Sequence, residues 1–246
     1  MADVDEGIKE AEQTNGLARA QALRDLLENG RDLDTPRLEA VAVELGLPPA
    51  DVLLVAGHPI PGRLLPPERD LEVLREFGYR VSFCGHPQLA ALCEFLASMP
   101  DEGATPESRP ARDAADPEPF PAVLDGLMRN RGLGLRELPF VGLSLPTIRC
   151  MLGGGGQSLS ALQQVAGPLG WRLEDLAMLA GEPMRRLGHG PLLCRHVGAV
   201  FMAAVPRTTS QLVLAAREAD RLSAREDQGW WQPVSYGVDV CPDLRR

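Results

Sequence analysis

Two pairs of potential metal ligands stand out in the sequence, Cys84 with His86 and Cys194 with His196. Thiolates and imidazoles are ligands that Zn²⁺ prefers, so each pair suggests one half of a zinc site. One residue between the ligands is short for a zinc finger, however, and the two pairs lie more than 100 residues apart. Free cysteines buried in helices are the simpler interpretation, and we therefore expect no metal and no other cofactor.

The run of four glycines at residues 153–156 could also bind a ligand, because its backbone amides could contact a phosphate. It is not a P-loop, since no Lys-Ser/Thr pair follows it and no strand is expected before it. The sequence has no serine nucleophile elbow, zinc-protease motif or dinucleotide fingerprint. We expect no enzyme, although a Cys/His enzyme that uses Cys84 or Cys194 stays open as an alternative.

The composition indicates that helices position these residues. Of the 246 residues, 44% are hydrophobic and 24% are charged, as in ordinary globular proteins, but only 4% are aromatic. The apolar residues are mostly Leu, Ala and Val, which favours helices over a β-sandwich or a β-barrel. We therefore expect an all-α fold.

The charge and the apolar stretches limit the partners and the compartment. A net charge of −9 argues against a protein that coats nucleic acid or an anionic membrane with its whole surface. The longest apolar stretch, Val197 to Val205, is about half the ~20 residues that a membrane-spanning helix needs, so we expect no membrane partner. The odd count of five cysteines and an N-terminus without signal-peptide features predict reduced thiols in the cytoplasm.

An internal repeat organises the chain. Residues 35–59 align without gaps with residues 159–183, at an offset of 124 positions. Their shared apolar residues follow the i, i+3, i+4, i+7 spacing of a helix face, and glycines stand where each helix should end. Upstream the match continues at an offset of 125, and the second copy has further helical segments at about residues 120–130 and 135–141. The matching residues of the first copy are Leu38, Val41, Ala42, Leu45, Gly46, Asp51, Ala56, Gly57 and Pro59.

Residues 120–183 resemble the phage-repressor (Cro-like, or XRE) helix-turn-helix family, and residues 9–59 resemble it less closely. We name these stretches repeat 2 and repeat 1. The resemblance implies two repressor-like helix-turn-helix bundles with accessory helices around them. The residues that carry it in repeat 2 are Leu135, Arg136, Glu137 and Leu138 in the second helix, Gly142, Leu143 and Ser144 in the turn, Thr147, Ile148 and Arg149 in the third helix, Leu162, Ala166, Leu169 and Gly170 in the fourth, and Leu173 to Leu179 in the fifth.

The resemblance also implies a DNA-binding site in repeat 2. In this family the third helix enters the major groove of double-stranded DNA, and the second helix lies across the backbone. Ser144 would then cap the third helix, and Thr147 and Arg149 are the candidates for contacts with base edges. Arg129 and Arg131, near the end of the preceding helix, would contact phosphates.

Four more residues complete the set of DNA-binding candidates. Arg136 lies in the second helix of repeat 2, and the third helix of repeat 1 offers Arg19, Gln21 and Arg24. Residues 121–186 have seven arginines against five acidic residues, whereas residues 8–66 have six basic residues against nine acidic ones. If one repeat binds DNA, we therefore expect it to be repeat 2.

The sequence thus predicts a sequence-specific DNA-binding transcriptional regulator that acts as a homodimer. One alternative is a helix-turn-helix scaffold that no longer reads DNA. It would bind a protein partner through its acidic N-terminal lobe or its aromatic tail, which contains Trp230, Trp231 and Tyr236. An enzyme built on the same scaffold is the less favoured alternative.

The predicted organisation has four parts. Residues 1–99 form an N-terminal, degenerate helix-turn-helix lobe whose accessory helices, Pro67 to Phe77 and Pro87 to Met99, are placed to close the core of repeat 1. Residues 100–119 form a flexible, acidic, Pro-rich linker, and residues 120–183 form the C-terminal helix-turn-helix domain. Residues 184–246 contain a buried helix from Pro191 to Val205, a helix opened by a capping box of Thr208 and Gln211, and the aromatic tail.

Overall fold

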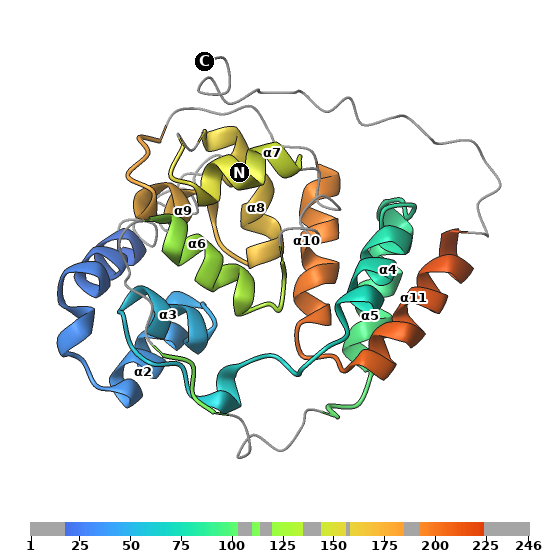
Figure 1. The fold of residues 1–246 in the computed structure, drawn as a ribbon, viewed down its shortest axis with the longest axis horizontal. Helices are drawn as coiled ribbons and strands as arrows, with labels where there is room; N and C mark the ends of the chain where they lie inside the picture. Colours follow the sequence, from blue (N-terminus) through green and yellow to red (C-terminus); the bar gives the residue numbers. More distant parts are fainter. Residues whose placement is uncertain are drawn as a thin grey trace, which may run out of the picture.

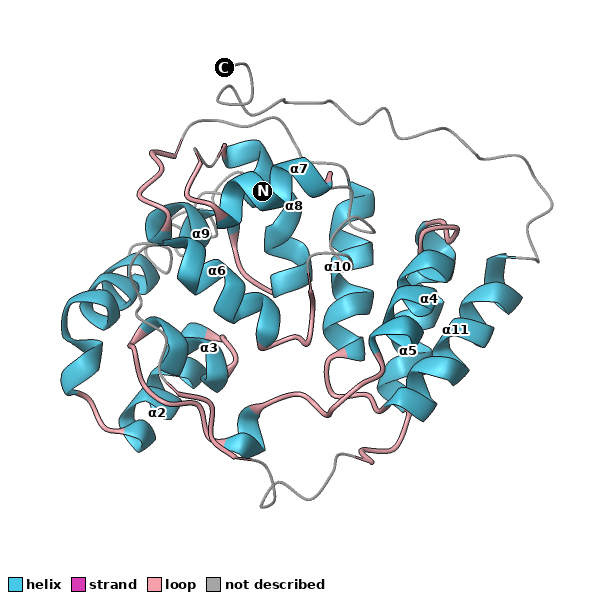
Figure 2. Ribbon diagram, viewed as in Figure 1, coloured by secondary structure: helices cyan, strands magenta, loops and turns pink. Residues whose placement is uncertain are grey.

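The computed structural model describes residues 18–102, 110–113, 120–134, 144–155, 158–184 and 192–223, without the side chains of residues 192–195. In these ranges every regular element is a helix, and the expected all-α fold is confirmed (Figure 1, Figure 2). In chain order the elements are a helix over residues 18–29, η1 (Gly30–Asp32), α2 (Thr35–Leu45), α3 (Pro49–Val55), η2 (Gly62–Leu64), α4 (Leu71–Val81), α5 (His86–Ser98), α6 (Phe120–Arg129), α7 (Leu145–Leu152), α8 (Leu159–Leu169), α9 (Leu173–Leu179), α10 (Leu192–Ala204) and α11 (Thr209–Ser223).

The helices α2 and α8 are equivalent in the two repeats and begin and end in the same way. The Asp34 side chain caps α2 by accepting from the Arg37 amide at 3.0 Å, and Ser158 caps α8 in the same manner. Both helices end at a glycine in the left-handed conformation, Gly46 with φ 58° and Gly170 with φ 65°. The short helices α3 and α9 follow, packed on α2 and α8 respectively.

The two repeats are in direct contact through α3 and α6. Gly126 of α6 lies against Leu54 of α3, and a Cβ atom at this position would lie only 2.6 Å from either Leu54 methyl carbon. Glycine therefore allows the two helices to approach closely. The buried apolar residues of both repeats belong to one hydrophobic core.

The two accessory helices pack mainly on the C-terminal helices. The helix α4 contacts α11, and α5 contacts both α10 and α11, so that the four helices form a group at one side of the molecule (Figure 1). Phe77 of α4 and Phe201 of α10 meet edge to face, with ring centroids 6.0 Å apart. The expectation that α4 and α5 close the core of repeat 1 is thereby corrected, since the apolar faces that cover them come from α10 and α11.

The helix α10 joins this group to repeat 2. It packs on α8 as well as on α5. At the crossing, Gly198 of α10 lies on the backbone of Gly167, and a Cβ atom on Gly198 would lie 2.5 Å from the Gly167 carbonyl carbon. The separation of α8 and α10 is therefore set by contact between their backbones.

Local signals explain where the accessory and C-terminal helices begin. The helix α4 begins at Leu71 and not at Pro67, because the Asp70 side chain accepts from the Glu72 amide at 2.8 Å and serves as the N-cap. The capping box ahead of α11 is confirmed. The Thr208 amide donates to Gln211 Oε1 at 3.0 Å, and the Gln211 amide donates to Thr208 Oγ1 at 3.4 Å.

The predicted linker is held at two points, one at its start and one inside it. The Pro100 carbonyl accepts from Gln211 Nε2 at 2.7 Å, and Arg112 forms an isolated antiparallel bridge with Ile60, with both N–H···O distances 2.9 Å. Residues 103–109 and 114–119 of the linker, the predicted helix over 135–141 and the aromatic tail lie outside the described residues. Among the described helices, none combines the length and the apolar run needed to cross a bilayer.

Candidate functional site

One face of helix α7 packs in the core, and the rest of its surface is exposed to solvent or half-buried. Its buried residues are Ile148 and Met151, which are 1% and 2% exposed, and α6 packs against it. Leu145 and Arg149 are exposed on the remaining surface, and Thr147 is half-buried. The predicted third helix of repeat 2 is therefore present, with Arg149 facing solvent.

Ser144 caps α7 as predicted. Its Oγ accepts from the Thr147 amide at 3.3 Å and lies 2.8 Å from Thr147 Oγ1. One of these two hydroxyls donates to the other, so the second keeps its proton for an outside acceptor. The pair places a hydroxyl at the start of the helix, and Arg149 places an exposed guanidinium group in its last turn. Both are groups that can read base edges.

Of the predicted phosphate contacts, Arg129 is exposed and Arg131 is not. Arg129 pairs with Asp125 one turn earlier in α6, at 2.8 Å and largely in solvent, which is a weak interaction that a phosphate can replace. Arg131 is only 2% exposed, and its guanidinium group forms two parallel bonds with the Asp51 carboxylate. The prediction that Arg131 contacts phosphate is wrong, because the cation is buried and already neutralised. Arg136 lies outside the described residues.

The carboxylate that holds Arg131 has a complete set of hydrogen bonds. Asp51 is fully buried in the first turn of α3. Its Oδ1 accepts from Asn130 Nδ2 at 2.7 Å and from Arg131, and its Oδ2 accepts from Arg131 at 2.5 Å and from Trp171 Nε1 at 2.7 Å. A carboxylate with four donors is compensated for the loss of water. The sequence analysis missed this cluster, which joins α3 of repeat 1 to residues of repeat 2.

A second ion pair crosses between the repeats in the opposite direction. Arg19, in the helix over residues 18–29, binds Asp175 of α9 with nitrogen–oxygen distances of 2.7 and 2.8 Å, and it also donates to the Leu45 carbonyl. Arg19 is half-buried, and a contact with DNA would have to compete with this ion pair, so its role in DNA reading stays a prediction. Gln21 is exposed and donates to Asp25 at 2.8 Å, and Arg24 is exposed.

The two inter-repeat contacts are reciprocal. Arg131 of repeat 2 binds Asp51 of repeat 1 and the Leu169 carbonyl of its own repeat. Arg19 binds Asp175 of the other repeat and the Leu45 carbonyl of its own. Asp51 and Asp175 are equivalent in the sequence repeat, and so are Leu45 and Leu169. The accepting groups therefore occupy equivalent positions in the two repeats, whereas the two donating arginines do not.

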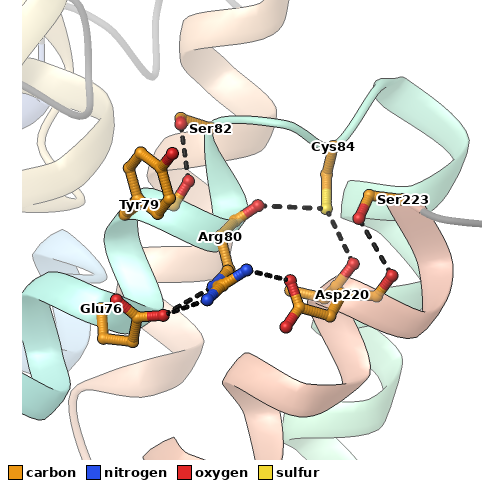
Figure 3. Close-up of polar contacts among 8 residues, drawn as sticks. Glu76, Tyr79, Arg80, Ser82, Cys84, Asp220 and Ser223 are labelled. Carbon is orange, nitrogen blue, oxygen red and sulfur yellow. Dashed lines mark hydrogen bonds and ion pairs between the residues drawn. The ribbon is translucent and has the colours of Figure 1, made fainter.

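The candidate zinc ligands are only partly brought together. His86 and His196 face each other, with their Nδ1 atoms 3.1 Å apart. Cys84 is buried, and its thiol contacts the carbonyls of Arg80 and Ala219 at 3.8 and 3.7 Å (Figure 3). No group of three His, Cys, Asp or Glu side chains that could hold a metal occurs in the part of the chain that the structure describes. The Cys194 side chain lies outside that part.

The cysteines differ in oxidation state and in acidity. Burial raises the pKa of the Cys84 thiol to about 11, and the negative charge of Asp220 adds to this shift. Cys84 and Cys93 are free. Cys150 is half-buried and disulfide-bonded, so the expectation of an entirely reduced set of thiols is corrected.

Comparison of the chain with protein-family models, with curated proteins and with solved structures finds no match.

Proposed function

We propose that this chain is a DNA-binding transcriptional regulator of the repressor helix-turn-helix type, and that α7 of repeat 2 enters the major groove. The observation that supports this most is the two-sided character of α7. Ile148 and Met151 fix one side of the helix in the core, Arg149 is exposed, and the hydroxyls of the N-cap Ser144 and of the half-buried Thr147 lie at the start of the helix. A reading helix needs this arrangement, because base contacts require side chains held on a rigid element.

The charge distribution predicts that DNA binding depends on few arginine side chains. Arg19 and Arg131 are neutralised inside the protein, so Arg149 and Arg129 are the predicted contacts of repeat 2 that remain exposed in the described region. Each phosphate contact adds about −0.9 to the slope of log K against log salt on duplex DNA. We therefore expect a shallow salt dependence, and Arg129→Ala should flatten it by about 0.9.

The proposal is tested by selecting sequences from a pool of random duplexes with the full chain and then measuring binding by fluorescence anisotropy. Arg149→Ala should weaken binding to the selected site by about 5- to 150-fold, the equivalent of ~1 to 3 kcal/mol, and relax the preference at one base position. Arg217→Ala is the matched control, because Arg217 is an exposed arginine on α11. Equal losses for the two variants would contradict base reading by α7.

A helix-turn-helix scaffold that binds a protein is the second candidate. It is favoured by the use of Arg19 and Arg131 in internal ion pairs and by the net charge of −9, both of which reduce the attraction to DNA. If the folded protein binds no duplex at about 50 mM salt, where the counterion effect is strong, this candidate replaces the first.

The homodimer is part of the same proposal. Repressor-type units bind two half-sites about one helical turn apart, usually as dimers. Sedimentation of the full chain with and without the selected duplex tests this. One chain per duplex would show that the two repeats of a single chain suffice, and two chains would support the homodimer.

A further inference from the structure

Two histidines from distant parts of the chain meet at the interface between α5 and α10. His86 is the first residue of α5, and His196 lies in the second turn of α10. Their Nδ1 atoms are 3.1 Å apart, and the rings cross at 74° with centroids 4.6 Å apart. His86 is exposed and His196 is half-buried, so dissolved ions can reach the pair.

The contact places two potential metal-binding atoms at the right separation. A hydrogen bond between the two Nδ1 atoms requires one ring to donate its proton and the other to offer its lone pair. If that ring changes to the tautomer that carries its proton at Nε2, both Nδ1 lone pairs face the same space. Two imidazole nitrogens on a tetrahedral ion with Zn–N bonds of about 2.0–2.1 Å lie roughly 3.3–3.4 Å apart. The observed 3.1 Å needs only a small opening to match.

We propose that His86 and His196 form a binding site for a divalent transition-metal ion of the class that prefers imidazole, such as Zn²⁺. Binding requires the donor ring to change tautomer: it gives up its proton at Nδ1 and takes one up at Nε2, so that two neutral imidazoles bind the ion, no net proton is released and the oxidation state of the metal is unchanged. The described side chains supply these two ligands, and water can take the other positions of the ion. The site is therefore exchangeable, unlike a closed structural zinc site.

A bound ion would add a link between α5 and α10, two helices that already pack against each other. The helix α5 packs in the group with α4 and α11, whereas α10 also packs on α8 of repeat 2. An ion that binds only when both histidines are in place stabilises this arrangement in proportion to its concentration. Metal occupancy would thus strengthen the contact between the accessory helices and repeat 2.

The test uses the full chain after treatment with a chelator, titrated with ZnCl₂ by isothermal calorimetry. We expect one Zn²⁺ per chain and a rise in the unfolding temperature that the chelator reverses. His86→Gln and His196→Gln should each weaken Zn²⁺ binding at least tenfold. His58→Gln is the matched control and should bind normally, since His58 Nε2 contacts the carbonyls of Gly30 and Arg31 elsewhere. MgCl₂ should give no binding, because Mg²⁺ prefers oxygen ligands.

A spectroscopic measurement keeps the proposal testable if a variant fails to fold. In the wild-type chain, long-range ¹H–¹⁵N spectra of the imidazoles should show Zn²⁺-dependent shifts at the Nδ1 atoms of His86 and His196, with those of His58 unchanged. Absence of Zn²⁺ binding by the wild-type chain would overturn the proposal. Binding that persists in the folded double variant would overturn it as well.

Discussion

Asp51 and Asp175 occupy the same position in the two repeats, and each carboxylate binds an arginine that belongs to the other repeat. Asp51 binds Arg131, and Asp175 binds Arg19. The two ion pairs differ in burial, because the Asp51 and Arg131 side chains are 0% and 2% exposed, whereas the Arg19 side chain is 18% exposed. The two repeats are therefore joined by one fully buried ion pair and one that is partly exposed to solvent.

Replacing Arg131 by methionine should destabilise the protein strongly. The substitution leaves the buried Asp51 carboxylate without its cation, and breaking a buried pair in this way costs about 3–5 kcal/mol. Urea unfolding followed by circular dichroism measures the loss. Arg129→Met, two residues away, is the control and should cost at most about 1 kcal/mol, since its pair with Asp125 is exposed. Equal losses for the two variants would show that Asp51 is not buried in solution.

Replacing Arg19 by methionine should have a smaller effect of the same kind. The contact with Asp175 is partly solvated, so the loss should lie near the ~1–3 kcal/mol of a charge-assisted hydrogen bond. Gln21→Met is the control, because Gln21 is exposed and its side chain donates to Asp25 one turn later in the same helix. A loss for Arg19→Met that exceeds the loss for Arg131→Met would contradict the order of burial.

Replacing Gly198 by valine should loosen the crossing of α8 and α10. A Cβ atom there would lie 2.5 Å from the Gly167 backbone, so one helix must shift, and overpacking of this kind costs about 1–3 kcal/mol. Ala199→Val is the matched control, because Ala199 is exposed and the change costs only the helix propensity of valine, at most about 0.7 kcal/mol. Differential scanning calorimetry measures both variants. A Gly198→Val protein as stable as the control would exclude the close backbone contact.

Cys84 should react slowly with iodoacetamide in the folded protein. A pKa of about 11 instead of 9.0 lowers the thiolate population at pH 8 about 100-fold, and only the thiolate reacts. Between pH 8 and pH 10 the rate should rise about tenfold per pH unit, because the pKa lies above this window. Mass spectrometry of the Cys84 peptide measures the rate, with the urea-unfolded chain as control. Equal rates for the two states would contradict the burial of this thiol.

The helices of the repeats could be predicted because their signals are local. A gapless repeat with apolar residues at helical spacing predicts α2, α3, α8 and α9, and a glycine one residue beyond α2 and α8 predicts where they end. The capping box of Thr208 and Gln211 is likewise contained in four residues. The start of α4 was misplaced because proline at residue 67 and aspartate at residue 70 are both start signals, and the aspartate forms the cap.

The site was harder to predict, because its decisive contacts join distant residues. Asp51 and Arg131 are 80 positions apart, and an arginine near the end of a helix looks the same in a sequence whether it faces solvent or a buried carboxylate. One signal was present. Asp51 and Asp175 are the single acidic position that the two gapless copies share, and both lie in the first turn of a short, mostly apolar helix. A shared charge on a buried face predicts a partner but does not say which residue it is.

The order in which the chain leaves the ribosome gives the Asp51 cluster a consequence for folding. Every side-chain donor to Asp51 lies downstream of it, with Arg131 80 residues later and Trp171 120 residues later. At a synthesis rate of about 5–20 residues per second, Arg131 is synthesised ~4–16 s after Asp51, and Trp171 ~6–24 s after it. Because an uncompensated carboxylate favours water, we expect the start of α3 to remain exposed to solvent in the nascent repeat 1 during this time. We therefore expect the native core of repeat 1 to close only after most of repeat 2 has been made.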